Sequence, residues 1–396
     1  MNEPLLNEAT GLADRIRGWR RHLHAHPELS GQEQNTARFV AGELRKLGYE
    51  PAERVGGTFG LTAQLAVKDR APAVALRADM DALAIQEETG LPFASQNPGV
   101  MHACGHDAHM AMLLGAAKLL QGHKDRLGRS VRLIFQPHEE IYPGGASAMI
   151  AAGVLENVES IFGLHIWSEL AVGELGTRTG PFMAGLNDFE ITLTGKGGHA
   201  AMPEQCIDPV VVAAQVIMAL QTVVSRSIAI TDQAVVSVTQ VEAGTAFNII
   251  PERVTLRGTI RMFDEAVRAR LCSRVRELAE GVARAYGAEA QVRIEPGYPV
   301  LVNDPRATER ALRAARRLGL KDAALQTLPL QGGAEDFAYY CREVPGVFVF
   351  VGTRNEAKGC IHPHHHPRFD VDEEVLPLGA ALLAQFALEP ADGRAG

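Results

Sequence analysis

The sequence predicts an α/β protein in which a mostly parallel sheet, with helices on both faces, is interrupted by a smaller inserted α+β domain. In the first half of the chain, apolar strands alternate with amphipathic helices, an order typical of parallel sheets that are covered on both sides. From about residue 186 the order becomes strand, helix, strand, strand, helix, strand. That order is typical of the split βαβ, or ferredoxin-like, arrangement.

The elements of the first half follow from the spacing of their apolar residues. In residues 35–49, Phe39, Val40 and Leu44 recur at helical spacing and mark one face of a helix. A second helix is expected over 107–121, and buried strands over 71–83, 130–137 and 160–167. Ligands of such sheets bind at the carboxyl ends of the strands. We therefore expect a functional site among the polar residues that follow these strands.

The inserted domain is predicted over residues 186–296. Its expected strands are 187–195, 233–244, 253–263 and 289–296, and its expected helices are 208–225 and 264–287. A helix over 306–318 and a strand over 346–352 then return to the first domain. The chain is thus expected to form a discontinuous larger domain, residues 1–185 and 297–396, with a lid-like insertion.

Composition limits the class of protein. With 396 residues the chain is long enough for two domains, and 46% hydrophobic with 22% charged residues is ordinary for a globular protein. A net charge of −8 argues against a nucleic acid or a polybasic contact with a membrane. Apolar runs such as 111–120 are too short to span a bilayer, and the charged N-terminus has no signal core. Five scattered cysteines argue against a disulfide framework, so we expect a cytoplasmic protein.

Metal-binding side chains collect in the segments that follow the predicted strands. The stretch HACGHDAHM, residues 102–110, alone holds three histidines, a cysteine and an aspartate. Each ligand has an ordinary explanation, since a strand-end histidine is more often structural and a pair of glutamates is usually a solvated turn. Together they place potential ligands on four loops at one edge of the sheet, which predicts a metal site. The candidates are Asp79, Asp81, Cys104, His106, Glu139, Glu140, His165 and the cluster HPHHHPRFD at 362–370.

Hydrolysis of an amide is a reaction that these side chains could support. A divalent metal lowers the pKa of a bound water from 15.7 to about 7 and polarises the carbonyl, and two metals roughly 3.5–4 Å apart can share one hydroxide. A further carboxylate must take the proton from the water and pass it to the leaving amine. Adjacent glutamates can divide these tasks, because neighbouring side chains at a strand end point apart.

Nine motifs occur across nearly the whole chain in the order found in one superfamily of hydrolases. They are RRHLHAHPELSGQE, LRADMDAL, HACGHDAHM, FQPHEE, GLHIW, GKGGHAAMP, FNIIPERVTLRGTIR, GGAEDFAYY and HHPRFD. The chain resembles the aminoacylase/carboxypeptidase superfamily of dinuclear metallohydrolases. Within it, the chain is similar to the hippurate hydrolase and auxin–amino-acid conjugate hydrolase branch, whose members are N-acyl-L-amino acid amidohydrolases.

The resemblance implies two divalent metal ions per subunit. Manganese or zinc suits the mixed sulfur, nitrogen and oxygen ligands best, and cobalt or nickel is possible. Glu139 matches the general base of the family, and Asp79 and Asp81 are implied to support the ligands, with Asp81 orienting one of them. The implied metal ligands are Cys104, His106, Glu140, His165 and His365.

His365 is selected from a run of histidines by its register. Pro367, Phe369 and Asp370 align the family pattern H-x-P-x-F-D on this residue. The resemblance therefore leaves a supporting or solvated role to its neighbours, which are His362, His364 and His366.

The resemblance also assigns residues in the inserted domain. His199 matches a histidine that relatives use across a dimer interface to hold the oxyanion, although its glycine-rich segment could be a capped turn. Asn248 and Arg261 match residues that bind the substrate carboxylate, for which an arginine fork is well suited. The alternative for Arg261 is a charge on a strand surface. A homodimer, or a tetramer built from dimers, is the implied assembly, with the insertion as lid and dimerisation domain.

The segment around the glutamate pair differs from that of relatives. Relatives carry a small residue before the pair and glycines after it, whereas this chain has His138 before it and Ile141, Tyr142 and Pro143 after it. We expect this bulkier loop to reshape the pocket for the acyl or leaving group. Cys104 could in principle be a nucleophile. Hydroxide attack needs no acyl-enzyme, however, and a thiolate between metals is already consumed.

The expected function is hydrolysis of the acyl amide of an N-acyl amino acid, such as a hippurate-like, N-acetyl or indoleacetyl conjugate, to a carboxylic acid and a free amino acid. A dipeptidase or an aminobenzoyl-glutamate hydrolase on the same scaffold is the alternative. A catalytically silent, metal-bound binding protein is the alternative from another class. The presence of Glu139 argues against it, because a binder needs no general base.

Overall fold

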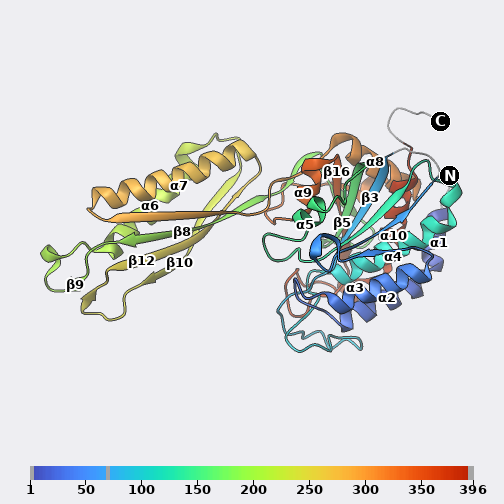
Figure 1. Ribbon diagram of the computed structural model, residues 1–396, viewed down its shortest axis with the longest axis horizontal. Coiled ribbons are helices and arrows are strands. Elements are labelled where there is room, and N and C mark those ends of the chain that lie inside the picture. The colour runs from blue at the N-terminus through green and yellow to red at the C-terminus, as the bar shows by residue number, and fades with distance from the viewer. Residues whose placement is uncertain (1–3, 68–71, 391–396) are drawn as a thin grey trace. The chain divides into compact units, whose positions relative to one another are not determined.

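The chain forms two compact units, shown in Figure 1. The computed structural model describes residues 4–67 and 72–390. The larger unit consists of Met1–Gly180, Val302–Pro329 and Asp336–Gly396, and the smaller unit of Pro181–Leu301 and Leu330–Glu335. Each unit buries an apolar core of its own.

The larger unit is built on a sheet of eight strands among the described residues, in the order β1-β2-β4-β3-β5-β16-β6-β15. The four central strands, β4, β3, β5 and β16, run parallel, whereas β2 and β6 pair antiparallel with β4 and β16. This mostly parallel sheet confirms the predicted α/β class. The strands are β1 Ala52–Glu53, β2 Leu61–Leu65, β3 Ala73–Asp79, β4 Val131–Gln136, β5 Val158–Ala171, β6 Leu175–Thr177, β15 Leu325–Thr327 and β16 Gly346–Arg354.

The central strands are continuous apolar runs because both faces of the sheet are covered. Every residue of β3 is buried, as expected for an inner parallel strand. The described helices of this unit are α1 Pro4–Gly11, α2 Ala13–Ala25, α3 Gln34–Lys46, α4 His106–Gly122, α5 Ala146–Ala151, α8 Pro305–Arg317, α9 Phe337–Glu343 and α10 Leu376–Leu388.

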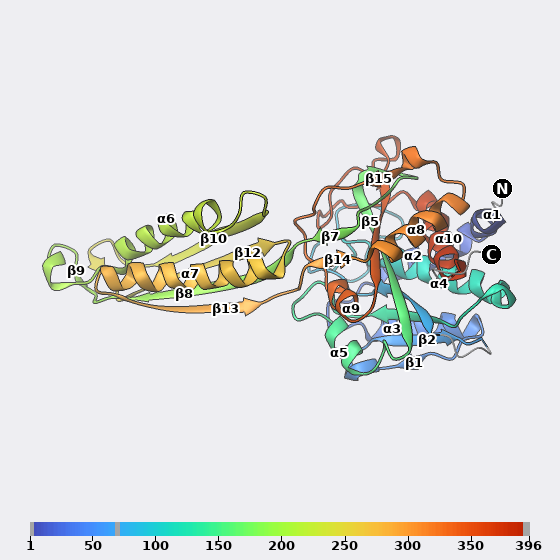
Figure 2. The ribbon, with the colours of Figure 1, turned by 90° about the horizontal axis from the view of Figure 1, so that it is seen from above.

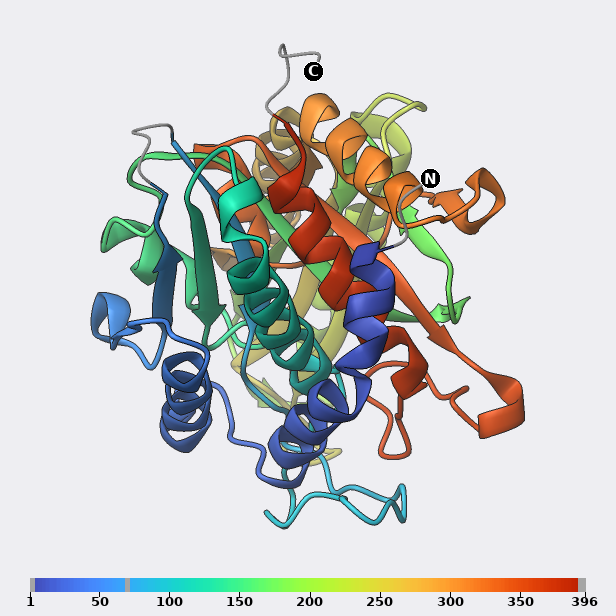
Figure 3. The ribbon, with the colours of Figure 1, turned by 90° about the vertical axis from the view of Figure 1, so that its right-hand side faces the viewer.

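Helices α4 and α10 pack side by side on the sheet and are almost entirely buried. Figure 3 shows both in front of it. Close approach is possible because Gly115 of α4 lies against Ala380, where an added Cβ would come within 2.8 Å of the alanine Cβ. This contact fixes α4, which begins at the candidate ligand His106.

The smaller unit has the predicted order of strand, helix, strand, strand, helix, strand. Its sheet is antiparallel with the order β10-β12-β8-β13, and α6 and α7 lie together on one face (Figure 2). Asp208 and Asp264 cap the two helices by accepting backbone N–H groups of the first turn. The elements are β8 Gly185–Thr194, α6 Pro209–Ser227, β10 Ala234–Ala243, β12 Arg253–Met262, α7 Glu265–Ala285 and β13 Glu289–Pro296.

Two further pairs of short strands complete the described structure. β9, Gly198–His199, pairs with β11, Ile249–Ile250, and β7, Gly180–Met183, pairs with β14, Leu301–Asn303. The sequence predicts neither pair, because strands of two to four residues give too short a pattern to recognise.

One described helix, α6, is long and apolar enough to cross a membrane by length and composition alone. The sequence predicts this run as a helix of the inserted domain, at residues 208–225. Its Val212, Val216 and Leu220 pack into the core of the smaller unit. The sheet beneath it thus accounts for one apolar face of α6.

Candidate metal centre

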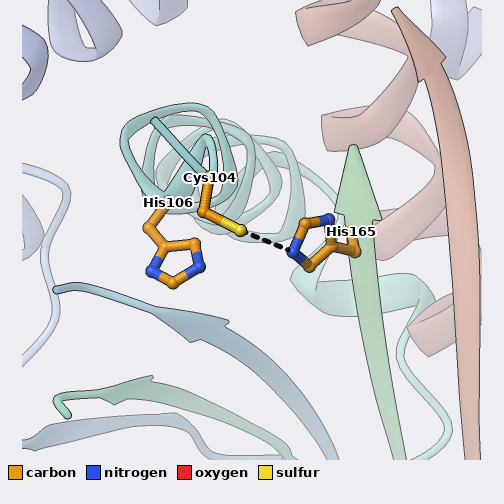
Figure 4. Close-up of side chains that lie close together, drawn as sticks. All are labelled: Cys104, His106 and His165. Atoms are coloured by element: carbon orange, nitrogen blue, oxygen red, sulfur yellow. Dashed lines mark hydrogen bonds between the residues drawn. The ribbon is translucent and has the colours of Figure 1, made fainter. Parts of the chain in front are cut away.

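The predicted ligands of the larger unit come from the ends of its central strands and the loops beside them. Asp79 ends β3, the glutamate pair follows β4, and His165 lies within β5. Gly105 is the N-cap of α4, and its φ of 90° requires a glycine. Figure 4 shows the result of this sharp turn, in which the Cys104 sulfur points at His165 with His106 beside it.

Two groups of potential ligands share the sulfur of Cys104. The first is Cys104, His106 and His165, and the second is Cys104, Glu140 and His365, with the ligand atoms of each group within 4.8 Å of one another. The sulfur lies 3.5 Å from His165 Nε2, and Glu140 Oε1 lies 3.6 Å from His365 Nε2. The structure therefore brings all five predicted ligands together as two triads with one common atom.

In His165 and His106, Nδ1 is hydrogen-bonded to another protein group, so Nε2 is the ring atom that could bind a metal. His165 Nδ1 donates to the carbonyl of Ile166 at 2.6 Å, and His106 Nδ1 donates to Asp81 Oδ1 at 3.2 Å. Such partners fix the tautomer of a metal-binding imidazole. Among the described residues, His106 Nε2 and Glu140 Oε1 are buried and have no hydrogen-bond partner. A buried polar atom without a partner is costly, and bound cations would satisfy both atoms.

The charges around the site favour a cation. Burial lowers the pKa of His106, but the charges of Asp79 and Asp81 raise it overall to about 10. Burial, followed by the charges of Glu140 and Glu139, raises the pKa of the Cys104 thiol well above its usual value. The protein alone therefore does not stabilise a thiolate, which argues against Cys104 as a free nucleophile. A bound metal ion would deprotonate the thiol.

Asp79 lies behind the ligands in a network that includes a histidine to which sequence reasoning gave no role. Ile166 N–H donates to His109 Nε2 at 2.9 Å, so the ring proton lies on Nδ1, which donates to Asp79 Oδ1 at 2.6 Å. Arg77 donates to the other oxygen of Asp79 at 2.6 Å. His109 thus has no lone pair left for a metal, although it lies near His106. The sequence does contain a signal for the position of His109: it lies three residues after His106, and residues at this spacing share a helix face.

Asp81 connects two ligand segments. Besides His106, its carboxylate accepts hydrogen bonds from Ser30 Oγ at 2.6 Å and from the backbone N–H of Glu140 at 2.9 Å. Glu139 is buried, and a carboxylate oxygen of this residue lies within 4.8 Å of ligand atoms of His106 and Glu140. Glu140 thus belongs to one of the two triads, and Glu139 lies beside them without belonging to either.

The histidines of the run near the C-terminus lie in different environments. His365 adopts a φ of 65°, and its N–H donates to the carbonyl of Ala103, which joins its loop to the Cys104 segment. His364 instead uses Nε2 toward the carbonyl of Ile166, at 3.1 Å. The rings of His362 and His366 stack on each other at 4.4 Å.

The candidates of the smaller unit lie at opposite ends of its sheet. His199 and Asn248 are exposed and adjacent, since Ala200 N–H donates to the Asn248 carbonyl. Arg261 is half-buried near the other end of β12, where its guanidinium donates to Thr259 Oγ1. The eight residue-to-residue steps from Arg253 to Arg261 span about 26 Å in a strand. One copy of this unit therefore does not bring His199 and Arg261 together.

The pattern of Peptidase family M20/M25/M40 matches residues 75–389. Thermostable carboxypeptidase 1 of Saccharolobus solfataricus is 42% identical over 98% of both chains. N-acetylcysteine deacetylase of Bacillus subtilis is 42% identical over 94% of this chain and 96% of its own. A crystal structure from Bacillus subtilis, described as a dinuclear metal-binding peptidase from the M20 family, has a TM-score of 0.85. It is 39% identical and covers 96% of this chain and 98% of its own.

Proposed function

Because the chain belongs to peptidase family M20/M25/M40, we propose that it is a metal-dependent amidohydrolase that cleaves the acyl amide of N-acyl amino acids. The products are a carboxylic acid and a free amino acid. The observation that carries the proposal is the pair of ligand triads that share the Cys104 sulfur. A cysteine sulfur shared by two neighbouring groups of ligands would suit the binding of two cations.

The names of two relatives support this class of substrate. An N-acetylcysteine deacetylase and a carboxypeptidase both act on an amide whose amine side is an amino acid with a free α-carboxylate. A hippurate-like, N-acetyl or indoleacetyl amino acid has the same feature. The carboxypeptidase relative also favours a second candidate function, removal of the last residue of a short peptide.

The proposed ligands suit divalent transition metals. Cys104, His106 and His165 would hold one ion, and Cys104, Glu140 and His365 the other, with manganese or zinc the most suitable metals. When bound, such ions lower the pKa of water and polarise an amide carbonyl. Asp81 orients His106 through its Nδ1 and holds the backbone of Glu140.

Glu139 is the proposed proton carrier. Its buried carboxylate lies beside the ligand atoms but belongs to neither triad that shares the sulfur. It accepts the proton of the attacking water and donates it to the amine as the amide C–N bond breaks. The pair follows β4, and a carboxylate oxygen of each glutamate lies within 4.8 Å of the other, so the two side chains do not point apart as the sequence predicted. Glu140 is the proposed ligand because it belongs to the triad with Cys104 and His365, which leaves the proton transfer to Glu139.

The smaller unit is proposed to supply groups for substrate binding. Arg261 binds the α-carboxylate through its guanidinium. His199 accepts the Ala201 N–H at Nδ1, at 3.0 Å, so its exposed Nε2 carries a proton that can be donated to an oxyanion. Because His199 and Asn248 lie outside β12, near the end of the sheet at which Arg253 begins this strand, and Arg261 lies near the other end, one small substrate can meet both ends only if two subunits contribute. We therefore propose a homodimer in which the smaller unit is both lid and dimerisation domain.

A comparison of the two adjacent glutamates tests the mechanism. Glu139→Gln should lower kcat for benzoyl-glycine and N-acetyl amino acids by about 10²–10⁴-fold while elemental analysis still finds two metals per subunit. Glu140→Gln is the matched control and should lose metal together with activity. Substantial turnover by metal-loaded Glu139→Gln would remove Glu139 as the proton carrier.

The substrate class is tested on chelator-treated protein reloaded with manganese or zinc. We expect hydrolysis of N-acyl amino acids and a large loss for their methyl esters, which lack the α-carboxylate. Dipeptides, aminobenzoyl-glutamate and peptides with a free carboxyl terminus separate the alternative activities. If metal-loaded protein hydrolyses none of these compounds, the chain is a binding protein instead.

A further inference from the structure

The loop that carries Glu139 begins with an unfavourable backbone conformation. His138 has a φ of 59°, in the left-handed region that residues with a side chain rarely adopt. Such a conformation persists only where the surrounding structure enforces it. The contacts of His138 therefore control the direction in which the next side chain, Glu139, leaves the chain.

Both backbone polar groups of His138 are bound. Its N–H donates to Glu33 Oε1 at 2.8 Å, and its carbonyl accepts the Gly145 N–H at 2.8 Å. Glu33 lies far away in the sequence, and its side chain is fully buried. The same Oε1 also accepts the Gly31 N–H at 2.8 Å, which restrains the carboxylate.

A second carboxylate, that of Asp81, binds the backbone on the other side of Glu139. Asp81 Oδ2 accepts the N–H of Glu140 at 2.9 Å. The backbone on both sides of Glu139 is therefore bound to a buried carboxylate from a different segment of the larger unit. Of these two carboxylates, only that of Asp81 also contacts a proposed metal ligand, through His106.

We propose that Glu33 is a positioning residue that aims the Glu139 carboxylate by holding His138 in its left-handed conformation. This inference rests on the proposed function in one respect, since it takes Glu139 to be the proton carrier.

A purely structural role explains Glu33 less well. The residue is the N-cap of α3, yet its side chain makes no capping hydrogen bond. Its Oε2 is buried without a hydrogen-bond partner among the described residues, which costs stability. Burial also raises the pKa of Glu33 to about 7. A glutamate that weakens the fold in this way is better explained by its contact with the loop of the proposed base.

Three substitutions of Glu33 test the proposal. Glu33→Met fills the space without an acceptor, Glu33→Ala removes the side chain, and Glu33→Gln keeps an oxygen for the two N–H groups. We expect Glu33→Met and Glu33→Ala to lower kcat by about 10–100-fold, as a displacement of about 1 Å can do, with KM and metal content close to wild type. Glu33→Gln should retain most of the wild-type kcat.

Glu28 provides the matched control. Its carboxylate accepts the backbone N–H groups of Asn35 and Thr36, both at 2.8 Å, and so supports the start of α3 rather than the loop. Glu28→Ala should lower the melting temperature and leave kcat unchanged. A second change, His138→Gly, should restore much of the kcat of Glu33→Met, because glycine adopts a positive φ without strain.

Crystal structures of the wild type and Glu33→Met give a readout that is independent of activity. We expect residue 138 to leave the left-handed region and the Glu139 carboxylate to move in the variant. An unchanged loop, or a wild-type kcat in Glu33→Met, overturns the proposal. If the wild type hydrolyses no amide, the proposed function fails, and the two crystal structures still decide whether Glu33 holds the loop. If Glu33→Met does not fold, the same comparison is made with Glu33→Ala.

Discussion

Arg20 and His24, both on α2, bind the carboxylate of Asp107, which directly follows the proposed ligand His106. Arg20 Nε donates to Asp107 Oδ2 at 3.1 Å and His24 Nδ1 donates to the same oxygen at 2.8 Å. Arg20 also donates to Asp370, at 2.7 Å, in the segment after His365. Two ligand segments distant in sequence are thus joined through α2. Ion pairs this deeply buried are strongly destabilising when one partner is removed.

His24 makes a pH-dependent contribution to stability. Burial lowers the pKa of His24, but the charge of Asp107 and hydrogen bonds to Asp107 and Glu87 raise it to about 9, above the ordinary value of 6.5. The folded state therefore binds the proton more tightly than the unfolded state does. The resulting stability is complete below pH 6.5 and is lost as the pH rises to 9.

The upward shift in the pKa of His24 limits its pH-dependent contribution to the free energy of unfolding to about 3 kcal/mol. We expect the free energy of unfolding in urea to fall between pH 6.5 and 9 in the wild type and to fall less in His24→Gln. Equal slopes in the two proteins would show that His24 is not charged in the folded state.

At the scale of elements, the turn at the start of α4 determines whether the Cys104 sulfur points at His165 with His106 beside it. Gly105 has a φ of 90°, and an added Cβ would lie 2.0 Å from Cδ1 of Ile166. An alanine would be strained by its backbone and would also collide with β5. Gly122, at the end of the same helix, has no atom within 4 Å of an added Cβ.

Gly105, which caps the start of α4, and Gly122, at its end, therefore predict opposite outcomes. Gly105→Ala should destabilise the protein by about 2–5 kcal/mol and reduce the metal content. Gly122→Ala should leave stability unchanged or raise it by up to about 1 kcal/mol. Chemical denaturation and elemental analysis measure both effects, and retention of two metals by a stable Gly105→Ala variant would contradict the role given to this turn.

At the scale of the whole molecule, the chain is a hydrolase of the M20/M25/M40 peptidase family. Its proposed chemistry lies in the larger unit and its proposed substrate contacts in the smaller unit, and each unit has a core of its own. The placement of His199 and Arg261 toward opposite ends of the smaller unit leads to the proposal that subunits exchange residues. An exchange of residues between subunits can be tested by combining two different inactive variants in one dimer.

Hybrid dimers should recover activity when the two defects lie in different units. A dimer of one His199→Ala subunit and one Glu139→Gln subunit contains one intact site if His199 serves the partner, so about half of the wild-type activity is expected. A hybrid of Glu139→Gln with Glu140→Gln has no intact site and is the control. Purified hybrids carrying two different tags measure this, and an inactive first hybrid would mean that His199 does not act on the partner subunit.

The sequence predicted most of the fold because its signals are local. The continuous apolar strands, the spacing of α3 and α4, and the six elements of the smaller unit each follow from periodicity within a short window. The family resemblance, carried by nine ordered motifs, is confirmed by the match over residues 75–389. The roles of individual site residues stay predictions, although the structure brings the five proposed ligands together.

What the sequence alone determined was the type of each element, the order of the motifs and the set of candidate ligands, because each depends on neighbouring residues. Only the tertiary structure decided the contacts between distant segments. Glu33 reaches His138, His109 reaches Asp79, and Arg20 reaches Asp107. No local pattern shows that these side chains are removed from water, and removal from water is what makes their hydrogen bonds and charges strong.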